Sequence, residues 1–486
     1  MKKLLLICMP ILILSFEMLK INAQSVTRAI DISGYWGTEL KDDSGTQTFI
    51  FEISKDSTGI YSGYVHSYSN HGKLPKLKLG FIKLKESNIK ILANPEQGII
   101  YEGVLGPSHQ LIKGKLFYKD KTTLSMNLQK YSKEKLNKDF PGLLNKEKIF
   151  TYKKAVNLND GFKVAVPSEA GFDSILINEM MQKVYSGEYG ELHSVLVIKN
   201  GTIILEDYLG GFSINDLHAI QSCTKSIASL LVGIAIDKGY IKGVDNKILD
   251  FFPGYKNLKT TEWGKITLQH ILTMSSGIDW NDELDRKIHS PGNNIIETIF
   301  QSNIKNEPGT VFGYKSSDVD LIAGIIKKTT GMYADKFAEK YLFKPLGITD
   351  YDWHFDKQNG NPLMDGSLML RPRDMAKIGM LVLNKGNWKG KQIVSGEWIE
   401  GSTTKYFKVD PVFHYGYLWW LGNSQTEKGT KVILANGWGS QFIFIVPKLN
   451  LVAVTTGNNM EIKEHLKPLK MLDQYLIGNG VEIHKK

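Results

Sequence analysis

The chain has 486 residues and a formal net charge of +10, with 42% hydrophobic, 23% charged and 10% aromatic residues. This length is typical of two or three domains, and the composition is that of a globular protein, which excludes a disordered chain, a coiled coil and a collagen-like polymer. The basic residues are spread along the chain and form no concentrated stripe, so we expect no nucleic-acid partner.

Residues 1–23 have the pattern of a secretory signal peptide. Met1-Lys2-Lys3 is a basic start, residues 4–16 are apolar apart from Ser15, and Ala23 is a small residue at the expected cleavage position. The apolar run is too short to span a bilayer comfortably, and no later run of about 20 apolar residues occurs. The sequence therefore predicts a secreted or periplasmic protein with no membrane span after removal of the signal.

The cysteine content excludes a disulfide framework. Cys8 lies in the predicted signal, which leaves Cys223 as the one cysteine of the mature chain. A single cysteine forms no internal disulfide, so we expect the hydrophobic core to stabilise the protein even in an oxidising compartment.

Residues 28–130 are predicted to form an all-β domain. Short segments of alternating polarity, separated by polar turns, are typical of a small antiparallel barrel or sandwich. The expected strands are 48–53, 59–65, 89–92, 99–105 and 124–128. The function of this domain is not readable, and a packing module and a carbohydrate- or peptide-binding module both remain open.

Residues 131–165 are polar and lysine-rich, which predicts a linker, and residues 166–480 are predicted to form an α+β domain. Asn200-Gly201 marks a tight hairpin between two short apolar strands. Helices placed between terminal groups of strands favour an antiparallel sheet covered by helices. The expected helices are 174–184, 222–238, 268–274, 318–329 and 373–383, and the expected late strands are 417–421, 431–434, 442–446 and 452–456.

The candidate nucleophile is Ser222 in Ser222-Cys223-Thr224-Lys225. A serine hydroxyl is a poor nucleophile until a base takes its proton. A lysine three positions later on a helix lies on the same face, and burial disfavours the charged form of an ammonium group, which lets the amine act as a base.

The spacing S-x-x-K is weak evidence by itself, because it begins at five serines: Ser87, Ser132, Ser222, Ser302 and Ser402. Context separates them, since Ser222 alone opens a long apolar segment. A Ser–Lys pair at the start of a buried helix combines desolvation with the field of the helix N-terminus. The alternative interpretation of Ser222 is an ordinary helix N-cap.

With these residues in view, the chain resembles the serine hydrolases related to class C β-lactamases and penicillin-binding proteins. The resemblance covers about residues 167–480, and within it the branch of esterases and 6-aminohexanoate-dimer hydrolases looks closer than the β-lactamases themselves. It implies a β-lactamase/transpeptidase-like fold, an antiparallel sheet with helices. The stretches that carry it are Ser222–Gly239, Ile266–Gly277, Pro308–Ser316, Arg371–Lys377 and Gly437–Gln441.

The resemblance implies roles for three residues. Ser222 is expected to be the acylated nucleophile, Lys225 its activating partner, and Tyr314 the group that carries a proton between Ser222 and the leaving group. Which of Lys225 and Tyr314 is the general base remains open. The family's second motif is usually Tyr-x-Asn, and this chain matches at Tyr314 but has Ser316 in place of the asparagine. Ser316 is expected to contact substrate.

The family's third motif is usually Lys-Thr-Gly or His-x-Gly, and the equivalent region here, Asn436–Ser440, contains no cation. The missing lysine argues against efficient lactam turnover and fits neutral esters or amides better. Trp438, Gly439 and Ser440 are expected to contact substrate. A backbone N–H near Gly439 or Ser440 is expected to complete an oxyanion hole with the N–H of Ser222.

Three functions stay open at this point. The first is an exported serine hydrolase that cleaves a small-molecule ester or amide. The second is a D-alanyl peptidase or β-lactamase that acts on cell-wall peptide or lactams. The third is a non-enzymatic binding protein with a relic hydrolase domain. No metal or organic cofactor is implied, and the oligomeric state is not predicted.

Overall fold

The computed structural model describes residues 30–42, 45–69, 72–95, 97–140, 149–281, 284, 288 and 293–478. The predicted signal peptide, Cys8 included, lies outside these residues. The chain divides into two compact units, Met1–Lys146 with Gly210–Phe212, and Glu147–Leu209 with Ser213–Lys486. Among the helices that are described, none combines the length and apolar character needed to cross a membrane.

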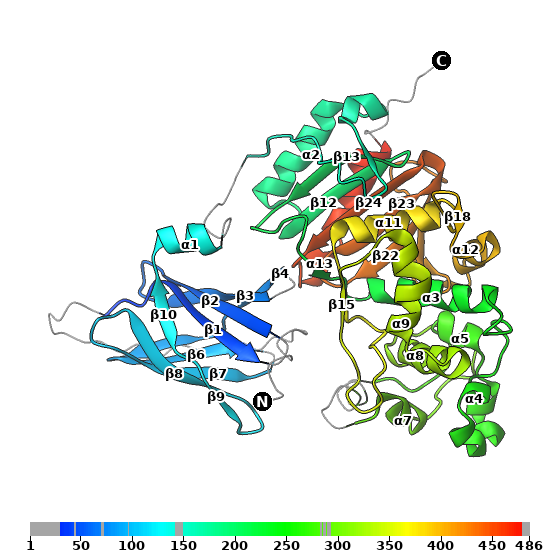
Figure 1. Ribbon diagram of the computed structural model, residues 1–486, viewed down its shortest axis with the longest axis horizontal. Helices are drawn as coiled ribbons and strands as arrows, with labels where there is room; N and C mark the ends of the chain where they lie inside the picture. Colours follow the sequence, from blue (N-terminus) through cyan, green and yellow to red (C-terminus); the bar gives the residue numbers. More distant parts are fainter. Residues whose placement is uncertain are drawn as a thin grey trace. The chain divides into compact units, whose positions relative to one another are not determined.

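The described residues of the first unit are all-β apart from helix α1, as the sequence predicts. Its described strands form a curled antiparallel sheet in the order β4-β3-β2-β1-β10-β8-β7-β6-β5, with β9 paired to β8 (Figure 1). The strands are β1 (Gly34–Asp42), β2 (Gly45–Lys55), β3 (Tyr61–Ser69), β4 (Gly72–Lys78), β5 (Ile82–Lys85), β6 (Asn88–Asn94), β7 (Ile99–Leu105), β8 (Leu111–Phe117), β9 (Thr123–Ser125) and β10 (Leu128–Tyr131).

The curl of this sheet follows from alternation and from one crossing segment. Ile89 and Ile91 of β6 point into the core while the residues beside them on the strand are more exposed. Between β4 and β5, Leu79 N–H donates to the carbonyl of Gly63 and Gly80 N–H donates to the carbonyl of Leu92, both at 2.9 Å. These bonds draw the two ends of the sheet together around an apolar core.

The expected strand 124–128 is wrong in one respect, because β9 ends at Ser125 and β10 begins at Leu128. Met126 N–H donates to the Gly114 carbonyl at 2.9 Å, and the Asn127 side chain accepts from Gly114 N–H at 3.3 Å. This local exchange interrupts the ladder. Helix α1 (Lys133–Asp139) and strand β11 (Lys163–Val164) lie inside the segment predicted as a linker.

The second unit is built on a sheet of nine described strands in the order β11-β13-β12-β24-β23-β22-β21-β20-β19. All neighbours are antiparallel except β11 and β13, so the predicted α+β domain with an antiparallel sheet is confirmed. Besides β11, the strands are β12 (Leu192–Lys199), β13 (Thr202–Tyr208), β19 (Phe407–Lys408), β20 (His414–Tyr415), β21 (Trp420–Asn423), β22 (Lys431–Gly437), β23 (Gln441–Val446) and β24 (Leu451–Gly457).

The expected strand 417–421 is displaced toward β21. Leu418 has φ +62°, and its N–H donates to the Leu272 carbonyl at 2.9 Å. A left-handed residue breaks the extended backbone, so the strand begins only at Trp420.

Alternation along β12 divides the second unit into two cores. Val195 and Val197 pack with one cluster, which includes residues of α2 (Ser174–Ser186). Leu196 and Ile198 pack with a larger cluster on the opposite face, which includes residues of α3 (Cys223–Asp237). Figure 1 shows helices on both faces of this sheet.

The helices that cover the sheet are mostly short. The remaining ones are α4 (Ile248–Phe251), α5 (Leu268–Leu272), α7 (Ile295–Phe300), α8 (Ser317–Thr330), α9 (Ala334–Ala338), α10 (Lys344–Leu346), α11 (Pro372–Leu383), α12 (Gly396–Ser402), α13 (Ile462–His465) and α14 (Lys467–Leu472). The pair β14 (His218–Ala219) and β16 (Leu368–Leu370) leads directly into the start of α3.

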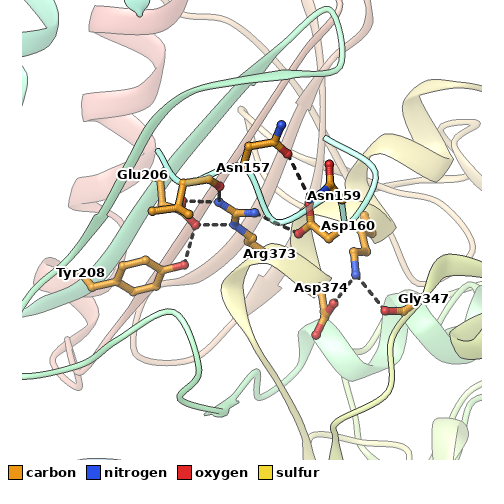
Figure 2. A network of polar contacts seen from close by, with 10 residues as sticks. Asn157, Asn159, Asp160, Glu206, Tyr208, Gly347, Arg373 and Asp374 are labelled. Carbon is orange, nitrogen blue, oxygen red and sulfur yellow. Dashed lines mark hydrogen bonds and ion pairs between the residues drawn. The ribbon is translucent and has the colours of Figure 1, made fainter. Parts of the chain in front are cut away.

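A buried polar network ties α11 to the sheet (Figure 2). The Arg373 guanidinium donates to both carboxylate oxygens of Glu206, at 2.7 and 2.6 Å, and to Asp160 at 3.0 Å. Tyr208 donates to Glu206 at 2.8 Å. Because a buried guanidinium is expensive to desolvate unless it is fully paired, this network fixes the segment around Asp160 against β13.

Candidate active site

Ser222 stands at the start of α3, a deeply buried helix. Residues 223–235 of α3 are all buried. Ser222 itself has φ −63° and ψ −4°, which is helical geometry, and its side chain makes no capping hydrogen bond. The chain turns sharply just before it, since Gln221 has φ +51°. The ordinary N-cap interpretation of Ser222 is therefore not supported.

Lys225 is one helical turn along and reaches back to the serine. Its Nζ donates to Ser222 Oγ at 3.1 Å and also to the backbone carbonyl of Asp365. The side chain is buried, with 2% of the residue exposed. This distance is within the range for proton transfer between a nucleophile and its base.

Tyr314 completes the group from a distant part of the sequence. The Lys225 Nζ lies 5.3 Å from the centroid of the Tyr314 ring. Tyr314 is 40% exposed, so the phenol is accessible from solvent. Its ring meets Tyr415 edge-on at 6.2 Å and lies 5.6 Å from Trp420. The structure thus brings the three predicted residues Ser222, Lys225 and Tyr314 together.

A cluster beside Tyr314 was missed by the sequence reasoning. Lys315 Nζ donates to Ser276 Oγ at 3.2 Å, and Ser276 Oγ donates to Asp318 Oδ1 at 2.7 Å. Burial raises the pKa of Asp318 to about 6, against the opposing effect of the Lys315 charge. The sequence offered two signals for this cluster. One is the lysine at the middle position of the Tyr-x-Asn motif, and the other is Met274–Gly277, which belongs to a stretch that carries the family resemblance.

The hairpin between β22 and β23 packs on the start of α3. A Cβ built on Gly437 would lie 2.2 Å from the carbonyl oxygen of Ile220, so this close approach requires glycine. The Cys223 thiol donates to the Gln441 carbonyl at 3.2 Å, and burial raises the pKa of that thiol. Cys223 is therefore a packed neighbour of Ser222 in its unreactive thiol form.

The predicted substrate-contacting residues of this hairpin differ in their surroundings. Ser440 is fully buried, its N–H donates to His465 Nδ1 at 3.0 Å, and its hydroxyl donates to the His465 carbonyl at 2.8 Å. The geometry therefore does not support Ser440 N–H as an oxyanion donor. Trp438 is half-buried, with its ring 5.0 Å from the His465 ring, and Gly439 is buried with φ +82°.

Ser316 is half-buried at the N-cap of α8, two residues after Tyr314, and its side chain makes no capping bond. Its carbonyl accepts the N–H of Val319 at 3.0 Å. Within the described part of the chain, no three His, Cys, Asp or Glu side chains are arranged to hold a metal ion.

The fold and the match to a family model together define the class of protein. The sheet with helices on both faces is the β-lactamase/transpeptidase-like fold. The model of the Beta-lactamase family matches residues 192–472, more than half of the chain, and the chain belongs to that family. This confirms the resemblance and the fold inferred from the sequence.

Relatives agree with this assignment at low identity. The chain is 25% identical over 284 residues to the 6-aminohexanoate-dimer hydrolase of Paenarthrobacter ureafaciens, over 53% of this chain and 70% of that protein. It is 29% identical over 198 residues to a Bacillus subtilis protein assigned as penicillin-binding, over 38% of this chain and 47% of that one, so it spans about half of that relative.

A solved structure shows the same fold. A Bacillus anthracis protein assigned as a 6-aminohexanoate-dimer hydrolase superposes with a TM-score of 0.53 at 19% identity, over 71% of this chain and 95% of that one. The family is hydrolytic, and its members support hydrolase function for this chain.

Proposed function

We propose that this protein is an exported serine hydrolase that cleaves ester or amide bonds through an acyl intermediate on Ser222. The observation that carries the proposal is the 3.1 Å contact between Lys225 Nζ and Ser222 Oγ at the start of a buried helix. The Tyr314 ring stands beside the same Lys225 nitrogen, with its centroid 5.3 Å away. A hydroxyl in contact with an amine, and a phenol beside that amine, are groups that acyl transfer can use.

The reaction runs in two halves. Ser222 Oγ attacks the carbonyl carbon while its proton passes to Lys225 Nζ or to the Tyr314 oxygen, whichever acts as the base. The tetrahedral intermediate collapses, the carbon–oxygen or carbon–nitrogen bond breaks, and the leaving group takes a proton from Tyr314. Water then attacks the acyl-serine by the reverse proton path, which releases the acid and restores Ser222.

The negative charge of the tetrahedral oxygen needs two donors. The N–H of Ser222 is the first, because it lies at the N-terminus of α3, where the helix field favours an anion. The second is assigned to the hairpin Gly437–Gln441, which packs on this turn. Since Ser440 N–H is engaged with His465, the donor is another N–H of that hairpin.

Neutral acyl groups fit the site best. The segment Asn436–Ser440 offers no cation for a substrate carboxylate. The exposed face of Tyr314 continues into Trp420, which offers an aromatic wall for an apolar substituent. The similarity to a 6-aminohexanoate-dimer hydrolase favours an amide within this class.

The test is pre-steady-state hydrolysis of p-nitrophenyl acyl esters. Wild-type protein should give a burst of nitrophenol equal to the number of active sites, and Ser222→Ala should give none. Ser302→Ala is the matched control, because Ser302 also stands three residues before a lysine while its hydroxyl donates to the Thr298 carbonyl at 3.3 Å. Wild-type turnover by Ser222→Ala would refute the assignment.

A second candidate is a D-alanyl peptidase or β-lactamase on the same Ser222. The observation in its favour is the similarity to a protein assigned as penicillin-binding. Labelling by a fluorescent penicillin that is lost in Ser222→Ala would support this candidate. Absence of labelling at saturating dose, with ester turnover intact, would leave the ester or amide hydrolase.

A further inference from the structure

The loop that carries Tyr314 is tied to a single segment on both sides of the tyrosine. Before it, Gly313 N–H donates to the Met274 carbonyl at 2.8 Å. After it, Lys315 Nζ donates to Ser276 Oγ at 3.2 Å and reaches the Ile278 carbonyl at 3.4 Å. Tyr314 therefore projects from a loop held at both flanks by residues 274–278.

The second tether is a buried, charged one. Lys315 is 6% exposed, and Ser276 and Asp318 are fully buried. Ser276 Oγ accepts from the lysine and donates to Asp318 Oδ1 at 2.7 Å, so the serine links the two charges. Asp318 lies on the first turn of α8, the helix that follows the loop. Ser276 thus joins the Tyr314 loop, α8 and the segment 274–278.

The cluster is not explained by stability alone, because buried charges rarely stabilise a fold more than apolar residues of the same size would. Its main effect is geometric, since charge-assisted hydrogen bonds have narrow distance and angle preferences. Tyr415, which packs edge-on against Tyr314, is fully buried, and its phenol pKa is raised first by this burial and then by Tyr314 and Asp318.

We propose that Lys315, Ser276 and Asp318 are positioning residues that hold the Tyr314 phenol at the Ser222–Lys225 pair. This inference rests on the proposed function, because it assigns the role of the cluster through Tyr314. None of the three residues needs to touch the substrate. Misplacing a catalytic group by about 1 Å costs about 100-fold in rate, so loss of the tether should slow the chemical step and leave binding intact.

The test is a double-mutant cycle on kcat with a p-nitrophenyl ester. Lys315→Met removes the charge and keeps the side-chain length, and it should lower kcat about 10–100-fold with KM little changed. In a Tyr314→Phe background the same substitution should have almost no further effect, because the group that it positions is already missing. A merely structural role would give the same loss in both backgrounds.

Lys377→Met is the matched control. Lys377 and Asp374 on α11 are also a buried lysine and aspartate three residues apart, here in direct contact, with Nζ and Oδ1 at 2.8 Å. Removing that lysine should lower the melting temperature and leave kcat per burst-titrated site unchanged. Should Lys315→Met fail to fold, Ser276→Ala removes only the linking hydroxyl and enters the same cycle.

The outcomes separate the two proposals. Wild-type kcat in both Lys315→Met and Ser276→Ala, or equal losses with and without Tyr314, would overturn the positioning role. Wild-type kcat in Tyr314→Phe would instead overturn the proposed role of the phenol. A loss in Tyr314→Phe that Lys315→Met reproduces and does not add to would support both.

Discussion

Two helices of this protein start with the same S-x-x-K spacing, and they use it differently. In the first unit, Ser132 precedes α1 with extended backbone, φ −75° and ψ 158°, and its hydroxyl accepts the Lys135 N–H at 3.1 Å. In the second unit, Ser222 precedes α3 with helical backbone and no capping bond, and its hydroxyl accepts from the Lys225 side chain at 3.1 Å.

The backbone conformation at the serine therefore decides whether its hydroxyl can cap the helix. An extended residue aims its side chain at the free N–H groups of the first turn, whereas a residue that is already helical does not. The left-handed Gln221 lets the chain enter α3 with Ser222 in the helical region. Burial also separates the two pairs, since the Lys135 side chain is half exposed and Lys225 is buried.

The largest expected effect comes from the two lysines. Lys225→Met should lower the burst rate with a p-nitrophenyl ester by about 10²–10⁴-fold, because a positioned acid–base group contributes that much. Lys135→Met should leave the rate unchanged, because the described contacts of that half-exposed side chain are with residues of the first unit, Asp139 at 4.0 Å and the Tyr131 ring at 4.4 Å among them. Equal rates for Lys225→Met and wild type would erase the distinction between the two pairs.

A second prediction concerns His465, a buried histidine that contacts Ser440 in the hairpin between β22 and β23. Burial lowers the pKa of His465 from its ordinary 6.5 to about 4, and neutral Nδ1 accepts the Ser440 N–H. The unfolded chain then binds the proton at higher pH than the folded one. The free energy of unfolding should therefore decrease by about 3 kcal/mol as the pH falls from 6.5 toward 4.

This prediction is checked by denaturant unfolding between pH 7 and 4. His465→Asn keeps an acceptor at the position of Nδ1 and does not titrate, so it should lose about 3 kcal/mol less than wild type over this interval. Asp318, with its raised pKa, acts with the opposite sign and is the same in both proteins. Parallel pH profiles for the two proteins would contradict the assignment of neutral His465.

Most of the fold could be predicted from local patterns. Asn200-Gly201 marked the hairpin of β12 and β13, and the apolar run after Ser222 marked α3. The errors fall where a tertiary contact overrides the strand pattern. Leu418 takes a left-handed conformation because its N–H is drawn to Leu272, a residue far away in the sequence.

The site could be predicted only in part, for the same reason. Ser222 and Lys225 are one turn apart, so their contact follows from the helix. The place of Tyr314 rested on the family resemblance, since no local pattern brings it to Lys225. Ser440 looked suitable as a donor in sequence, and only the fold shows that its N–H is used by His465. No role was predicted for Lys315, because its burial follows only from the fold.

A third prediction concerns Gly437, which packs closely against the Ile220 carbonyl just before Ser222. Gly437→Ala should cost about 1–3 kcal/mol of stability through overpacking, because the new Cβ meets the Ile220 carbonyl at 2.2 Å. Activity should fall as well, since the hairpin is pushed from Ser222. Gly401→Ala is the control, because nothing lies within 4 Å of its Cβ position. Normal stability and activity in Gly437→Ala would show that the close approach is unimportant.

The smallest expected effect is on helix stability, for which Ser132 should matter more than Ser222. Ser132→Ala should destabilise α1 locally by about 1 kcal/mol, because a capping hydroxyl is lost. Ser222→Ala should cost α3 less than that, because its hydroxyl caps nothing, although it abolishes turnover. Amide hydrogen exchange at Lys135 and Lys225 measures both effects in the intact chain. If Ser222→Ala loosened its helix as much as Ser132→Ala, then Ser222 would be a cap after all, and its geometry would no longer favour a nucleophile.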